Sequence, residues 1–221
     1  MIKQLLHIHQ RRALLSRIFD IKGDFSKLAE SCIPSYTNPN RLIALGFWWR
    51  LFASARLAGH LSHDRPVLDF GAAVGELAHL LPKGVDYHFM ESDPWLVSVL
   101  ETLVPHAQNT QMEQAAPATY QTIFALDALE HNHNPGMILA QLSNLLAHDG
   151  SMIISGPTEN ILYRLGRKIA GYPDHYHHFT IYQLEQLANE YLICEQTITG
   201  PFWLPLFRIS KWKKRTDVSP L

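Results

Sequence analysis

The sequence predicts an α/β protein with a mostly parallel sheet, and two observations support this fold class. From residue 66 onward, short apolar runs typical of strands alternate with longer segments of helical periodicity. The first apolar run, residues 67–70, ends in a turn of small residues at 71–75, after which leucines recur at helical spacing. A strand, a tight turn and a helix form the first unit of such a sheet, so we expect the chain to be organised around residues 67–75.

Length and composition favour one domain with a sizeable core. The chain has 221 residues, of which 47% are hydrophobic. Its two cysteines, Cys32 and Cys194, lie far apart and form no disulfide framework, so we expect a cytoplasmic protein. We find neither a signal-peptide pattern nor an uncharged apolar run long enough to span a membrane.

The charge is distributed unevenly along the chain. Counting Lys and Arg against Asp and Glu, residues 1–60 carry +6, residues 61–207 carry −11 and residues 208–221 carry +4. Basic ends around an acidic centre can indicate contact with anionic lipid or nucleic acid. We favour the simpler interpretation, a solvated surface whose charges balance.

The first 62 residues are predicted to form a helical cap, followed by a catalytic core over residues 63–215. Residues 2–19 form an amphipathic pattern with basic residues, and Asn40 is placed to cap a second helix over residues 41–61. That helix is rich in bulky apolar residues. It either packs on the core, covers an acceptor pocket as a lid, or lies in a membrane interface, and we favour the first two over the third.

The remaining elements are predicted from period and turn signals. Strands are expected at 85–90, 110–114, 122–126 and 151–155, helices at 95–103, 137–147 and 181–189, and extended runs at 191–199 and 202–212. We expect Asp149-Gly150 to form the turn into the strand at 151, Thr180 to cap the helix at 181, and residues 156–179 to form a long irregular loop.

The small-residue turn has a spacing that separates two classes of ligand. Amides at the start of a following helix would favour an anionic group. A dinucleotide fingerprint needs a small residue at the sixth position from Gly71, where this chain has Glu76. Asp69, Gly71, Ala73 and Gly75 instead resemble motif I of the class I S-adenosylmethionine (SAM) methyltransferases, acid-x-Gly-x-Gly-x-Gly, with Ala73 at the central glycine position. The resemblance implies that this turn binds the amino-acid part of SAM.

The end of the second strand carries an acid suited to a ribose. Glu91 lies where a carboxylate can accept hydrogen bonds from both ribose hydroxyls, and it matches the ribose-binding acid of that family. We assign Glu91 and its neighbour Ser92 to cofactor binding. The alternative is an ordinary exposed acid before a helix that Asp93 caps. Glu113, after the third strand, is the nearest candidate for the adenine contact.

Residues 126–135 resemble the Leu-Glu-His-x-x-x-Pro segment that follows the fourth strand in many small-molecule methyltransferases, including the quinone-biosynthesis group. The resemblance places Leu126 and Asp127 beside the methionine part of SAM. His131 is either a general base or a structural histidine bonded to the backbone. Gln121 replaces the acid that usually opens this strand, at what we expect to be a surface position of little consequence.

Residues 174–180 resemble the Asp-His-x-His-x-Phe-Ser/Thr segment before the last core helix of the same family. The resemblance implies that His175 and His177 lie over the acceptor pocket, as further candidates for base and acceptor positioning. Neighbouring histidines could also bind zinc, but no further metal-site spacing accompanies them and the family chemistry needs no metal. We therefore expect no metal.

Together the three motifs cover about residues 65–200. The resemblance implies a Rossmann-like, seven-stranded sheet with the last strand antiparallel, and an enzyme that methylates a small-molecule acceptor with S-adenosyl-L-methionine as cofactor. One alternative is a SAM-binding module without catalysis, or an enzyme that meets a lipid-linked acceptor at a membrane through its basic N-terminal helices. The other is an NAD or nucleotide-sugar enzyme. No nucleic-acid partner is expected, because the core is acidic and no Asn-Pro-Pro-Tyr-type motif is present.

Overall fold

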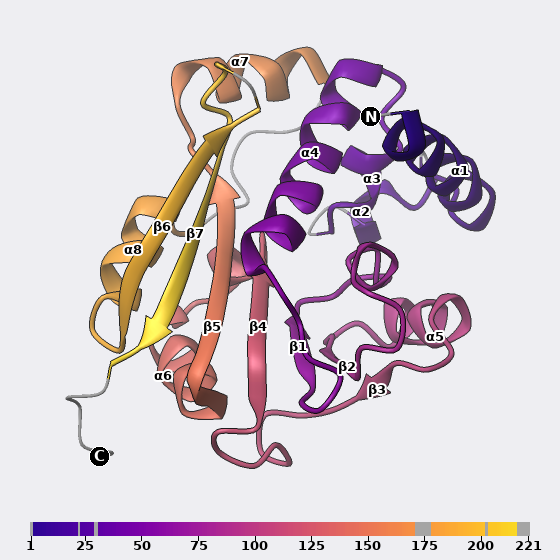
Figure 1. Ribbon diagram of the computed structural model, residues 1–221. Helices are drawn as coiled ribbons and strands as arrows, with labels where there is room; N and C mark the ends of the chain where they lie inside the picture. The colour runs from indigo at the N-terminus through magenta and orange to yellow at the C-terminus, as the bar shows by residue number, and fades with distance from the viewer. Residues whose placement is uncertain (1, 22, 29–30, 171–177, 202, 216–221) are drawn as a thin grey trace.

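The computed structural model describes residues 2–21, 23–28, 31–170, 178–201 and 203–215. Seven strands form one sheet in the order β3-β2-β1-β4-β5-β7-β6, in which β7 runs antiparallel to both neighbours and the other pairs are parallel (Figure 1). The strands are β1 (Val67–Phe70), β2 (Tyr87–Met90), β3 (Gln108–Asn109), β4 (Tyr120–Leu126), β5 (Leu146–Pro157), β6 (Leu192–Gly200) and β7 (Phe207–Lys214). The predicted α/β fold class is confirmed.

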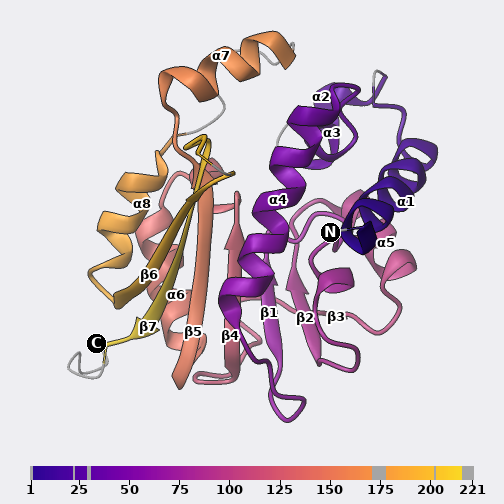
Figure 2. The ribbon, with the colours of Figure 1, turned by 45° about the horizontal axis from the view of Figure 1, so that its top comes forward.

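Helices cover both faces of this sheet (Figure 2). They are α1 (Ile2–Ile18), α2 (Phe25–Leu28), α3 (Ile33–Tyr36), α4 (Arg41–Ala58), α5 (Pro94–Leu103), α6 (Pro135–Leu145), α7 (Ile161–Ala170) and α8 (Ile181–Ala188), with 3-10 turns η1 (Ala78–Leu80) and η2 (Leu129–His131). In the part of the chain described here, no helix combines the length and the apolar character needed to cross a membrane.

The apolar core has two halves, one on each face of the sheet. Because successive side chains of a strand point to opposite faces, Val67 packs with α1, α4 and α5 while Leu68 packs with α6 and α8. β4 alternates in the same way, with Phe124 on the first side and Ile123 on the second. The helices before residue 59 therefore share one continuous core with the sheet.

Two helices begin where their capping residues predict. The side chain of Asn40 accepts a hydrogen bond from the backbone amide of Leu42 at the start of α4. Thr180 and Gln183 form a reciprocal capping box at the start of α8, which satisfies two otherwise unpaired amides.

Several boundaries differ from the sequence prediction. Residues 156–179 are not wholly irregular, since they contain α7. β5 begins at Leu146 and continues through Asp149-Gly150, because Leu146 pairs with Tyr120 of β4 before the register shifts. The side chain of Lys214 also donates a hydrogen bond to the Leu146 carbonyl (3.1 Å). α4 ends at Ala58 rather than residue 61, since Gly59 takes a positive φ of 83°.

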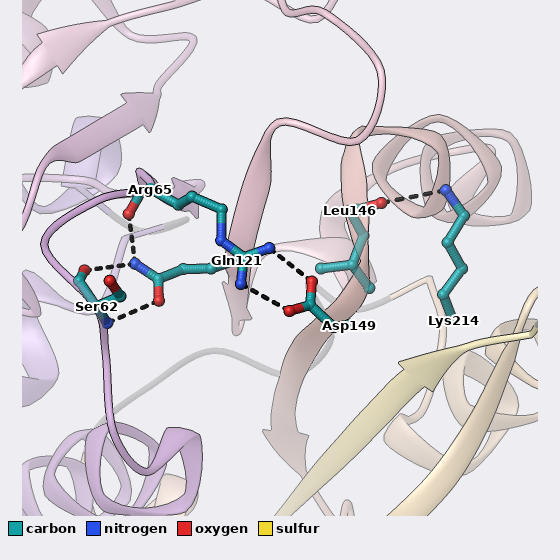
Figure 3. A network of polar contacts seen from close by, with 6 residues as sticks. All are labelled: Ser62, Arg65, Gln121, Leu146, Asp149 and Lys214. Carbon is teal, nitrogen blue, oxygen red and sulfur yellow. Dashed lines mark hydrogen bonds and ion pairs between the residues drawn. The ribbon is translucent and has the colours of Figure 1, made fainter.

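Gln121 corrects our expectation of an unimportant surface position. Its side chain is 8% exposed and crosses to the segment that joins α4 to β1 (Figure 3). Its Oε1 accepts from the Ser62 amide (2.8 Å), and its Nε2 donates to the carbonyls of Ser62 (2.7 Å) and Arg65. An amide fits where an acid would not, because two of the three contacts need a donor. Beside this network, the exposed Arg65 forms a two-pronged pair with Asp149.

We expect Gln121→Ala to lower the free energy of unfolding by about 2–3 kcal/mol, since three hydrogen bonds of about 1 kcal/mol each are lost around buried backbone groups. Urea unfolding measures this. Gln121→Glu should be destabilising as well, because a carboxylate cannot donate to the two carbonyls. Gln141→Ala, on the exposed face of α6, is the control and should change stability by less than about 0.5 kcal/mol. An equally small effect of Gln121→Ala would restore the surface interpretation.

Candidate functional site

A cavity of about 630 Å³ lies at the carboxyl ends of β1, β2 and β4. Three loops line it, the segments after β1, β2 and β4. Gln111, Met112 and Glu113 after β3 also contribute, as do Lys27, Ser31, Cys32 and Tyr36 from the N-terminal part of the chain. In a parallel sheet the carboxyl ends of neighbouring strands meet at one edge, and ligands bind where connections leave in opposite directions. The cavity has the size of a typical small-molecule site.

Backbone geometry explains the small residues after β1. Gly71 has a φ of +71°, and a Cβ added there would lie 2.4 Å from the Cβ of Ala128. Only glycine fits this crossing of two loops. Ala73 also has a positive φ, +48°, and lines the cavity. Gly75 (φ +75°) is absent from the cavity lining, and a Cβ there would instead come 3.0 Å from Leu100 of α5.

The α-helix predicted after this turn does not form. Residues 71–77 make successive turns, and the only helical element is η1, three residues long. The left-handed Gly75 and the extended Leu81 before Pro82 leave no room for an α-helix. Our expectation that helical amides favour an anion here was therefore wrong.

Glu76 holds this loop against the N-terminal helix. Its carboxylate is 3% exposed and accepts from Arg11 of α1, from Nε at 2.9 Å and from Nη2 at 2.6 Å. The residue that breaks the dinucleotide spacing thus closes an ion pair between α1 and the loop after β1.

Glu91 connects two of the three cavity loops. One carboxylate oxygen accepts from the amide of Ala73 (2.8 Å), and the other accepts from the amides of Ser92 (2.7 Å) and Asp93 (3.0 Å). Asp93 in turn caps α5 through the amide of Trp95 (2.8 Å). Oε2 keeps an open lone pair, whereas Oε1 accepts from both amides and from the Ser92 hydroxyl (3.4 Å), and Glu91 and Ser92 both line the cavity.

Asp69 lies under the cavity floor in a buried pair with Tyr87. The Tyr87 hydroxyl donates to Asp69 Oδ2 at 2.6 Å, and Asp69 is 4% exposed. Burial raises the pKa of Asp69 to about 7, although the Tyr87 hydrogen bond acts in the opposite direction.

The segment after β4 turns sharply at Asp127. Asp127 has a φ of +51°, its amide donates to the Ser155 carbonyl (3.0 Å), and Leu126 and Asp127 both line the cavity. Its carboxylate forms an ion pair with the fully buried Arg50 of α4. Arg50 Nη2 also donates to the Tyr36 hydroxyl (3.1 Å).

His131 lines the cavity at the end of η2. The segment before α8 lies beside it, since the His178 amide donates to the Glu130 carbonyl (2.9 Å) and the rings of His133 and His178 are 4.6 Å apart. His175 and His177, the other two predicted catalytic candidates, lie outside the described residues. In the part that is described, no cluster of three or more His, Cys, Asp or Glu side chains could hold a metal ion.

The structure brings most predicted site residues to one cavity: Asp69, Gly71, Ala73, Glu91, Ser92, Glu113, Leu126, Asp127 and His131. Sequence reasoning missed Cys32, Tyr36 and the buried Arg50. A single arginine in the apolar run of α4 was the available signal, because an arginine there must either reach solvent or find a buried partner.

We expect Asp69 to make stability depend on pH. Its folded pKa lies above the unfolded value of 3.8, so the folded state binds more protons between about pH 4 and 7, and this contribution to stability is lost as pH rises through that range. Relative to wild type, the free energy of unfolding of Asp69→Asn should rise by about 1.4 kcal/mol per pH unit across this window and show no further rise above it. Urea unfolding at a series of pH values tests this. Tyr87→Phe should extend the window to higher pH, because the Tyr87 hydrogen bond lowers the pKa of Asp69. A stability difference between Asp69→Asn and wild type that does not change with pH would refute the assignment.

We expect Arg50→Met to destabilise the fold by about 3–5 kcal/mol, because Asp127 keeps a charge without its partner. The double variant Arg50→Met/Asp127→Asn should recover part of the loss. Arg56→Met, on the exposed side of the same helix, is the matched control. If Arg50→Met and Arg56→Met cost the same in urea unfolding, the ion pair has no structural role.

Comparisons with known proteins agree with this geometry. The chain matches the family described as methyltransferase domain over residues 49–191. It is 24% identical over 238 residues to the ubiquinone biosynthesis O-methyltransferase of Aeromonas salmonicida. The aligned region covers 97% of this chain and 92% of that protein.

Two solved structures share the fold. A TehB-like SAM-dependent methyltransferase from Corynebacterium glutamicum is 18% identical with a TM-score of 0.53, covering 76% of this chain and 94% of that one. Haemonchus contortus phosphoethanolamine N-methyltransferase 2, in complex with SAM, is 12% identical with a TM-score of 0.55. The match covers 76% of this chain and 52% of that one. The family match over residues 49–191 shows that the chain belongs to the methyltransferase-domain family, and the two solved structures show that it shares their fold.

Proposed function

We propose that the cavity at the carboxyl ends of β1, β2 and β4 binds SAM and a small-molecule acceptor, and that this chain methylates that acceptor. The observation that carries the proposal is the convergence of the segments after β1, β2 and β4 on one cavity of about 630 Å³. SAM supplies a methyl group on a sulfonium, which a nucleophilic atom of the acceptor receives in line.

Each loop has a separate task in this proposal. The backbone of residues 71–75 binds the amino-acid part of SAM, with Gly71 keeping the loop close to Ala128. Glu91 binds the ribose hydroxyls through its carboxylate, in which Oε2 keeps an open lone pair and Oε1 exchanges the neighbouring Ser92 hydroxyl for one of the ribose. Leu126 and Asp127 contact the methionine part. Because Arg50 neutralises Asp127, this end of the cavity carries little net charge.

The acceptor side needs positioning and, for a hydroxyl or a protonated amine, removal of a proton. His131 lines the cavity and is our candidate for that base. His175 and His177 remain predicted partners from the segment before α8. The relative from Aeromonas salmonicida is named for O-methylation in ubiquinone biosynthesis, so a phenolic acceptor with a lipid tail is the first class to screen.

Isothermal titration with SAM, S-adenosylhomocysteine and NAD tests the cofactor. We expect micromolar binding of the first two and none of NAD. Glu91→Gln should weaken SAM binding by about 10- to 100-fold, since charge-assisted hydrogen bonds to two hydroxyls are lost. His131→Ala should leave SAM affinity within about threefold, because we assign it to the acceptor.

Gly71→Ala has a matched control in this chain. Gly59 also has a positive φ, +83°, but a Cβ there meets nothing within 4 Å. Both substitutions put a Cβ on a residue with a positive φ, but only Gly71→Ala should abolish SAM binding, because it pushes the cavity loop away from Ala128. Equal SAM affinity in Gly71→Ala and Gly59→Ala would remove this loop from the binding site, and binding of NAD in place of SAM would overturn the proposal.

A further inference from the structure

The helix α7 exposes its apolar side. Ile161, Leu162 and Leu165 are 88%, 41% and 53% exposed. Tyr163, which points the other way, is buried and its ring lies 5.9 Å from the ring of Phe207. At about 100° per residue, the three exposed side chains fall within one third of the helix circumference. α7 is therefore anchored by its opposite side and presents an apolar stripe to the outside.

The turn between β6 and β7 extends this stripe. Trp203 is 87% exposed and Leu204 is 37% exposed. The carbonyl of Pro205 accepts from the side chains of Thr158 (2.5 Å) and Asn160 (2.6 Å), so the turn is bound to the start of α7. We call these five exposed residues, Ile161, Leu162, Leu165, Trp203 and Leu204, the α7 surface.

The α7 surface lies at the edge of the sheet where the cavity opens. β5 is parallel to β4 and ends at Pro157, so the chain enters α7 at the same edge at which β1, β2 and β4 end. Gly200 and Phe207 bring the β6–β7 turn to that edge as well. Figures 1 and 2 both show α7 and this turn projecting together beyond the ends of the strands.

The charge of α7 indicates what the surface meets. Residues 161–170 contain Arg164, Arg167 and Lys168 and no acid, and the turn at 201–206 carries no charge. An exposed apolar stripe next to the exposed Arg164 and an exposed tryptophan suits the boundary between anionic headgroups and acyl chains.

The N-terminal helix α1, where the sequence alone placed membrane contact, fits less well. Two of its basic residues are engaged within the protein, Arg11 with Glu76 and Arg12 with the Asn38 carbonyl (2.5 Å). These guanidinium groups hold α1 to the cap and the cavity loop and are less available to lipid.

We propose that the α7 surface docks onto an anionic lipid bilayer and holds the cavity edge toward it. Ile161, Leu165 and Trp203 enter the interface, and Arg164 contacts the headgroups. Docking depends only on this surface. Docking would let an acceptor with a lipid tail pass from the bilayer to the cavity, and this consequence rests on the proposed function.

Vesicle flotation with the full chain at low salt tests the docking. We expect binding to vesicles of phosphatidylcholine and phosphatidylglycerol, weak binding to phosphatidylcholine alone, and release at high salt. Ile161→Asp/Leu165→Asp should reduce the partition by more than about tenfold. The control is Ile2→Asp/Leu5→Asp, which adds the same charges to α1 at exposed apolar positions and should change it by less than about twofold.

Circular dichroism confirms that both double variants fold. The proposal is overturned if wild type does not float with the anionic vesicles, or if the α1 variant loses binding as much as the α7 variant. It is also overturned if light scattering shows a dimer that the α7 variant dissociates, since a second copy then covers the surface. Flotation is measured without SAM and the SAM titration without vesicles, so either proposal can fail alone.

Discussion

The buried ion pair between Arg50 and Asp127 is the contact on which the arrangement of cap, sheet and cavity depends. The guanidinium of Arg50 is inaccessible to solvent. It lies 5.6 Å from the ring centres of Phe47, on its own helix, and of Phe207 on β7. A cation this deep is tolerable only with a charged partner and further acceptors, here Asp127 and Tyr36. One side chain thereby ties α3 and α4 to the end of β4.

This contact has a consequence for the cavity. Asp127 has a positive φ, which costs energy for a residue with a side chain, and the surrounding contacts must over-determine it. Arg50 restrains the carboxylate and the Ser155 carbonyl restrains the amide. The shape of the cavity wall is therefore decided by α4, a helix that ends at Ala58, before the first strand of the sheet begins at Val67.

The fold was largely predictable because its signals are local. Alternating apolar runs identified most of the strands, and side-chain caps at Asn40 and Thr180 marked helix starts. The error after Gly75 arose because the spacing of apolar residues predicts an α-helix that the backbone geometry does not allow. Leucines after Gly75 recur at helical intervals, but the left-handed Gly75 and Pro82 confine them to turns. α7 was missed although Ile161, Leu162 and Leu165 recur at helical spacing.

The loops of the site could be predicted from the sequence, but the side chains that hold those loops in place could not. Topology alone brings the carboxyl ends of β1, β2 and β4 together, so Gly71, Glu91 and Asp127 could be assigned to one site from sequence. The groups that hold these loops in place come from distant segments: Arg50 and Cys32 for Asp127, and Arg11 for Glu76. No periodicity or motif encodes a tertiary pairing of this kind.

The loop after β1 shows how the same binding task is met without a helix. Where a helix would hold the turn by its own hydrogen bonds, here the Glu91 carboxylate takes the Ala73 amide on one side and the Ser92 amide on the other. The acid that we assign to the ribose thus also shapes the turn that we assign to the amino-acid part of SAM. Because one side chain serves both loops, the two halves of the cofactor site are preorganised together, and a ligand that binds Glu91 meets a turn already in place.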